Sequence, residues 1–130
     1  MKSKIHVTEG ALANQVLKVK NGVIHMSCTG LKFIDKDTNQ YVVYIPALEL
    51  SGYGNTLEKA IEMMEQALDD FCDFLRTLKA PQLKAYLARL GWKHDIFADK
   101  EYSKPFADVD GSLKEFNALD NKVEYMSLAA

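Results

Sequence analysis

The sequence has few of the residues that hold small proteins together covalently or carry them across membranes. Its 130 residues include 2 cysteines, 3 prolines and 1 tryptophan. Two cysteines do not make the dense, even spacing of a secreted disulfide scaffold, so we interpret Cys28 and Cys72 as buried reduced thiols. No apolar run approaches the ~18 residues of a membrane span, and the start, MKSKIHVTEG, has no apolar signal region. We therefore expect no membrane association and a cytoplasmic location.

A strong charge of either sign is also missing. The net charge of −2 and the pI of about 5.9 lack the basic excess that marks many nucleic-acid-binding domains. With 48% hydrophobic and 26% charged residues, the composition is typical of one soluble globular domain. A chain of this length buries enough surface to fold without a metal or a disulfide. We predict a single domain over residues 1–130, with no cofactor.

Turn-forming pairs and apolar runs predict strands in the first third of the chain. Asn21-Gly22 separates two apolar-rich runs, and this dipeptide is the strongest short hairpin signal. A second strand pair, Leu31–Ile34 and Tyr41–Ile45, is joined by a polar turn. The second of these strands is β-branched or aromatic throughout, which predicts a central strand covered on both faces.

A proline, a glycine-containing loop and a long helix follow that strand. Pro46 has no N–H for a sheet ladder and ends the strand, and Gly52 and Gly54 are expected to take positive φ where the chain reverses. From Thr56 to Lys79 the apolar residues recur at spacings of three and four, the pattern of one helical stripe. Either residue 55 or residue 56 is the expected cap, with a capping box completed by residue 58. The residues interpreted as architecture are Pro46, Gly54, Asn55, Thr56, Glu58 and Ala60.

The last third predicts more helix than strand. A second helix is expected to begin at Pro81 and to end at Gly91, with Trp92 packing against its C-terminus. A capping-box pattern at residues 112 and 115 predicts a short helix around residues 113–119, and Val123–Leu128 is expected to return as a strand. We therefore predict a core over about residues 15–79 and a helical extension over about residues 81–130.

One segment resembles a known family. The run FIDKDTNQYVVYIPAL, followed by GNTLEKA and EQAL, spans Phe33–Leu68 and resembles the N-terminal domain of the HicB antitoxins. Leu48–Gly54, together with Leu90-Gly91-Trp92, looks like a HicB-related group of single-domain bacterial proteins. The resemblance covers roughly a third of the chain. It implies an α+β fold of the partial RNase H-like kind, in which a long helix packs on a small antiparallel sheet, here with C-terminal helices added.

The helix also carries a face rich in carboxylates. Its acids stand four apart in several places, a spacing at which a purely solvated face more usually places lysine. Such a face is suited to docking a basic partner, because complementary charge steers encounter and fixes register. With the resemblance, this predicts an antitoxin-like module that sequesters a small basic RNase-type toxin. The residues expected to bind that partner are Glu62, Glu65, Asp69, Asp73, Glu49 and Tyr53.

Other chemistry has less support in the sequence. A two-metal nuclease would need carboxylates on rigid strands, but Asp35 and Asp37 lie in a polar turn and the other acids lie on the helix. No histidine has a second ligand three or four residues away, so we predict neither a metal site nor catalysis. The alternative function is RNA binding, through lysines near two aromatic residues on the sheet: Lys18, Lys20, Lys32 and Lys36, with Phe33 and Tyr41. We also expect self-association through an unpaired sheet edge.

Overall fold

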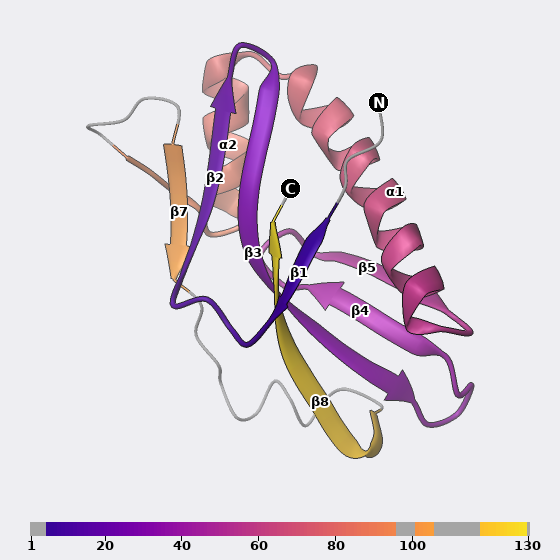
Figure 1. The fold of residues 1–130 in the computed structure, drawn as a ribbon. Coiled ribbons are helices and arrows are strands. Elements are labelled where there is room, and N and C mark those ends of the chain that lie inside the picture. The colour runs from indigo at the N-terminus through magenta and orange to yellow at the C-terminus, as the bar shows by residue number, and fades with distance from the viewer. Residues whose placement is uncertain (1–4, 96–100, 106–117, 130) are drawn as a thin grey trace.

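The computed structural model describes residues 5–95, 101–105 and 118–129. Eight strands and two helices make up this part of the chain (Figure 1). In chain order the elements are β1 (His6–Glu9), β2 (Asn14–Lys20), β3 (Val23–Asp35), β4 (Tyr41–Ile45), β5 (Leu50–Gly54), α1 (Leu57–Arg76), α2 (Ala80–Arg89), β6 (Lys93–His94), β7 (Glu101–Pro105) and β8 (Ala118–Ala129).

All of these strands join one large antiparallel sheet. Its order is β1-β8-β3-β2-β7-β6, with β4 paired to β3 and β5 paired to β4. The predicted fold class, a small sheet with a long helix and C-terminal helices, is therefore wrong: the fold is β-rich. Much of the difference comes from the last third of the chain, where β6, β7 and β8 add to the sheet. The predicted helical extension over residues 81–130 contains the helix α2, but the rest of its described part is mainly strand.

The two predicted hairpins are confirmed. Asn21 and Gly22 take φ of 52° and 77° between the paired residues Lys20 and Val23. Strands β3 and β4 pair from Leu31 with Tyr44 to Ile34 with Tyr41. The prediction that β4 is covered on both faces is wrong, because only its residues 43 and 45 are buried, on the face toward α1, and the others are half-buried.

The stretch between β4 and α1 is a hairpin rather than a long loop. Pro46 ends β4 as predicted, and a turn over residues 46–49 leads into β5, whose ladder begins with Leu50 opposite Ile45. The positive φ expected at two glycines belongs instead to Glu49, at 55°. Gly52 and Gly54 are extended strand residues. They are needed because α1 lies almost against them: a Cβ on Gly52 would stand 2.5 Å from the Ala60 carbonyl oxygen.

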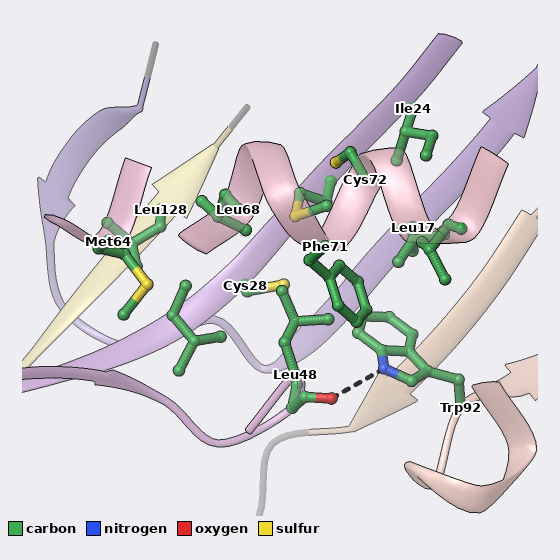
Figure 2. Close-up of a cluster of buried hydrophobic side chains, with 14 of the residues drawn as sticks. Leu17, Ile24, Cys28, Leu48, Met64, Leu68, Phe71, Cys72, Trp92 and Leu128 are labelled. Carbon is green, nitrogen blue, oxygen red and sulfur yellow. Dashed lines mark hydrogen bonds between the residues drawn. The ribbon is translucent and has the colours of Figure 1, made fainter. Parts of the chain in front are cut away.

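Helix α1 begins at a true cap and lays its apolar stripe on the sheet. The Thr56 side chain accepts a hydrogen bond from the Lys59 N–H at 3.1 Å, so Thr56 rather than Asn55 is the cap. Because the N3 position is Lys59, Glu58 does not complete a capping box. Ala60 is buried against the strands, as are Met64 and Leu68, which Figure 2 labels. The helix therefore covers one face of the sheet with its apolar side and leaves its polar side outward.

The predictions for the following residues are partly confirmed. Helix α2 contains Pro81 in its first turn, and Gly91 after it has φ of 93°. Trp92 is 3% exposed, and its indole N–H donates to the Ala47 carbonyl at 3.0 Å (Figure 2). The predicted last strand is confirmed within the longer β8. Residues 112–117 of the predicted short helix lie outside the described residues, and residues 118 and 119 belong to β8.

A buried polar pair connects β2 to β3 where the sheet divides. Strands β2 and β4 pair with the same side of β3, since β8 occupies its other side at both Ser27 and Leu31. Between them the Thr29 N–H donates to the Gln15 side-chain oxygen at 3.0 Å. The exposed fractions are 2% for Gln15 and 0% for Thr29. The Gln15 side chain therefore takes the place of a missing strand neighbour.

Replacing that side chain by an apolar one of similar size is expected to destabilise the fold. In Gln15→Leu the Thr29 N–H stays buried without this acceptor, which costs about 1–3 kcal/mol. Urea unfolding of the variant measures the loss. The control is Gln66→Leu on the exposed side of α1, where a change within about 0.5 kcal/mol is expected. Equal unfolding midpoints for the two variants would contradict this role of Gln15.

Candidate functional site: the acidic flank of helix α1

Helix α1 has two flanks of different chemistry on either side of its buried stripe. At 100° per residue, Glu58, Glu62, Glu65, Asp69 and Asp73 fall along one side, which we call the acidic flank. The opposite flank carries Lys59, Met63, Asp70 and Phe74. The helical spacing thus gathers the four helix acids predicted to bind a partner and adds Glu58, which was interpreted as a capping residue.

Parts of the acidic flank already have partners within the chain. The Glu65 carboxylate accepts a hydrogen bond from the Ile5 backbone N–H at 3.3 Å, and Asp73 forms an ion pair with Arg76 at 2.9 Å. The Arg76 side chain also donates to the Gly22 carbonyl at 2.8 Å, which ties the end of the helix to the β2–β3 turn. These two acids therefore contribute to the fold, and Asp69 is half-buried between them.

The two remaining acids are exposed. Glu58 and Glu62 make no hydrogen bond or ion pair with any residue that the structure describes. They stand one helical turn apart, so their charges repel mildly and neither is neutralised in place. This pair is the part of the acidic flank best placed to meet a cation from outside.

The other two predicted binding residues lie elsewhere. Glu49 is in the turn between β4 and β5, where its charge helps to raise the pKa of Tyr44, although burial of the phenol contributes more. Tyr53 is 52% exposed on β5, and its N–H donates to the Met63 sulfur at 3.4 Å on the opposite flank of α1. The six predicted residues therefore do not form one surface.

The carboxylates considered for a nuclease are not grouped either. The Asp35 carboxylate accepts hydrogen bonds from the Thr38 N–H and hydroxyl at 2.9 and 2.8 Å, so it stabilises the β3–β4 turn. Among the described residues, no cluster of three or more His, Cys, Asp or Glu side chains is arranged to hold a metal ion.

The two cysteines are not activated as nucleophiles, because burial raises the pKa of both thiols. Both cysteines are buried and unbridged. Burial raises the pKa of Cys28 to about 12 against the opposing effect of the nearby Lys104 charge, so its thiol stays protonated near neutral pH. Ser51 is exposed on β5.

The lysines predicted to bind RNA divide between two faces of the sheet. Side chains alternate between the two faces along β3, so Lys32 lies on the same face as the core residues Met26 and Cys28, the face that α1 covers. Lys18 pairs with His25 and therefore lies on the other face. Both are paired, Lys18 with Glu101 at 3.0 Å and Lys32 with Glu124 at 3.4 Å. The structure therefore does not assemble the predicted basic patch.

A groove on the α1 side of the sheet was missed by sequence reasoning. Its volume is about 330 Å³, and it lies at the N-terminal end of α1, where Leu57 lines it. Lys32, Tyr41 and Leu57 line one part of it, and Leu119, Lys122 and Glu124 of β8 line another. Nothing local marks these residues in the sequence, because the groove exists only through the long-range pairing of β3 with β8.

Comparisons with known proteins identify no relative. No protein-family model, curated protein or solved structure matches the chain. Separately, neither helix in the described part of the chain is long and apolar enough to span a membrane.

Proposed function

We propose that this chain is a non-enzymatic binding module that holds a small basic protein against the acidic flank of α1. The observation that carries the proposal is the pair Glu58 and Glu62, exposed and without partners among the described residues. The resemblance of Phe33–Leu68 to the HicB antitoxins adds the class of partner, a small RNase-type toxin. We place the module in the cytoplasm because the sequence shows no apolar signal region. The proposal rests on this flank and not on the fold class that the resemblance implied.

The geometry supports docking because the flank is firmly held. Glu65 accepts from the Ile5 N–H just before β1, Asp73 is paired with Arg76, and the apolar stripe of the helix is buried. A rigid charged surface loses little conformational freedom when a partner binds. Exposed charges of this kind contribute more to the rate of association than to the final affinity. The expected complex therefore forms quickly at low salt.

RNA binding has less support as the alternative. Lys18 and Lys32 lie on opposite faces of the sheet and each is paired with a carboxylate. A groove that binds a single strand needs unpaired cations along one track, with aromatic rings between them. Of the predicted cations, only Lys32 lies next to Tyr41, in the groove beyond the start of α1.

A charge reversal on each flank of α1 tests the proposal. Glu62→Lys is expected to weaken binding of a basic protein that co-purifies with the chain by about three- to tenfold at low salt, because an exposed pair contributes about 0.2–1 kcal/mol and reversal adds repulsion. The difference is expected to narrow above ~0.15 M salt, where the Debye length is about 8 Å. Biolayer interferometry at both salt concentrations measures it.

The matched control is Asp70→Lys, which makes the same change of charge on the opposite flank of the same helix. Because it changes the net charge equally but lies away from the acidic flank, Asp70→Lys is expected to weaken binding by less than twofold. Melting temperatures of both variants are expected to match the parent, since both side chains are exposed. Equal losses in the two variants would show that net charge alone matters, and the acidic flank would then not be the docking site.

A further inference from the structure

Strand β1 leaves one side of its backbone without a strand neighbour. Among the described residues it pairs only with β8, from His6 opposite Ala129 to Glu9 opposite Met126. The Gly10 N–H donates toward β8, to the Tyr125 carbonyl, whereas the Ile5 N–H donates away from β8, to Glu65. Peptide groups alternate in direction along a strand. The N–H and C=O groups of Val7 and Glu9 therefore point out from the sheet edge.

This edge lies beside the acidic flank of α1. The Ile5 N–H, directly before β1, donates to Glu65 at 3.3 Å, and in Figure 1 the start of β1 is the part of the strand that lies nearest to the helix. Val7 is opposite Leu128, which packs in the core under α1, so the Val7 side chain lies on the face that the helix covers. A strand added to this edge would turn every second side chain toward the same face. Glu58 and Glu62 are the exposed acids of that flank.

We propose that the basic partner contributes an extended segment that adds to the free edge of β1, with alternate Lys or Arg side chains facing Glu58 and Glu62. This rests on the proposed function and specifies how the partner binds. Backbone bonds to Val7 and Glu9 would supply affinity, and the alternating cations would supply specificity. A second copy of this chain is a less suitable occupant, because it would bring a second acidic flank rather than cations toward Glu58 and Glu62.

Defined peptides test this mode of binding directly. The probe is an acetylated heptapeptide of alternating valine and lysine. The control is the same peptide with every second backbone N–H, the set that would face β1, blocked by N-methylation. We expect N-methylation to weaken binding about tenfold or more, because two backbone hydrogen bonds of ordinary net strength account for that ratio. The Val7 amide is expected to gain protection from hydrogen exchange only with the unmethylated peptide.

Three variants of the protein make the same distinction. Val7→Pro removes the outward N–H and is expected to reduce peptide affinity about tenfold. Proline is tolerated on an edge strand whose N–H faces outward, and thermal melts check that the variant is folded. Val7→Ala keeps the N–H and is expected to bind within about threefold of the parent, while Glu62→Gln is expected to weaken binding at low salt only.

The outcomes separate this inference from the proposed function. Equal binding of both peptides with a clear dependence on Glu62 would overturn strand addition and leave the acidic flank as the docking site. Binding that depends on Val7 but is unchanged by Glu62→Gln would keep the edge and overturn the charge-based function. If neither peptide binds at 1 mM, strand addition is overturned, and the charge reversals with the whole basic protein decide the proposed function.

Discussion

Gly52→Ala is expected to lower the free energy of unfolding by about 3 kcal/mol or more, at the upper end of the range for overpacking. The added Cβ would stand 2.5 Å from the Ala60 carbonyl oxygen and 2.7 Å from the Met64 N atom. Both are backbone atoms inside a helix, so neither moves aside as a flexible side chain does. The helix must lift from β5, and this opens the apolar contacts of its whole buried stripe. Chemical denaturation followed by circular dichroism measures the effect.

The adjacent residue provides a matched control. Ser51 is exposed on the opposite face of β5, and Ser51→Ala is expected to change stability by no more than about 0.5 kcal/mol. Gly54→Ala should lie closer to Gly52→Ala, since its Cβ would stand 2.6 Å from the Lys59 Cβ. If Gly52→Ala and Ser51→Ala have the same unfolding midpoint, the close approach of α1 to β5 is not a requirement of the fold.

Local signals in the sequence were reliable where one short segment determines the structure. Asn21-Gly22 forms the predicted hairpin because both residues accept positive φ, and Gly91 ends α2 for the same reason. The stripe from Leu57 to Leu75 predicted α1 because its spacing matches the helical repeat. These features depend on residues a few positions apart, so the sequence alone is enough to find them.

Two other glycines were predicted wrongly, because they are needed for a tertiary contact and not for a turn. Gly52 and Gly54 resemble turn residues in the sequence, but both lie in β5. A side chain at either position would collide with α1, which packs directly against them. A close approach to another element and a positive φ leave the same mark in a sequence, namely a missing side chain. Only the position of α1 over β5 separates the two explanations.

The size of the sheet was missed because its outer pairings join distant parts of the chain. His6 is opposite Ala129, and Gln15 is opposite Lys104. No local pattern in a sequence reports a strand partner so far away along the chain, and the residues near β7 show little periodicity. The candidate site shows the same division. Helical spacing predicted a line of acids on α1. It did not reveal that Glu65 binds the backbone at Ile5, or that β1 has a strand neighbour on one side only among the residues that the structure describes.

Trp92→Ala is expected to cost about 3–5 kcal/mol, the range for removing a large buried aromatic side chain. The indole is 3% exposed, and Figure 2 shows its N–H pointing toward the turn between β4 and β5, where it donates to Ala47 at 3.0 Å. The Trp92 backbone N–H also donates to the Leu87 carbonyl at 3.0 Å, which fixes the residue to the end of α2. One side chain therefore joins α2 to the β4–β5 hairpin.

The smaller change Trp92→Phe separates the hydrogen bond from the packing. It keeps an aromatic ring but removes the donor to the Ala47 carbonyl, so we expect a loss of about 1–3 kcal/mol, well below that of Trp92→Ala. Because Trp92 is the only tryptophan in the chain, both variants must be followed by circular dichroism rather than by fluorescence. In the parent, the emission should be that of an indole away from water and should shift to the red on unfolding. A stability loss in Trp92→Ala no larger than in Trp92→Phe would mean that the hydrogen bond, and not the buried ring, connects the helix to the hairpin.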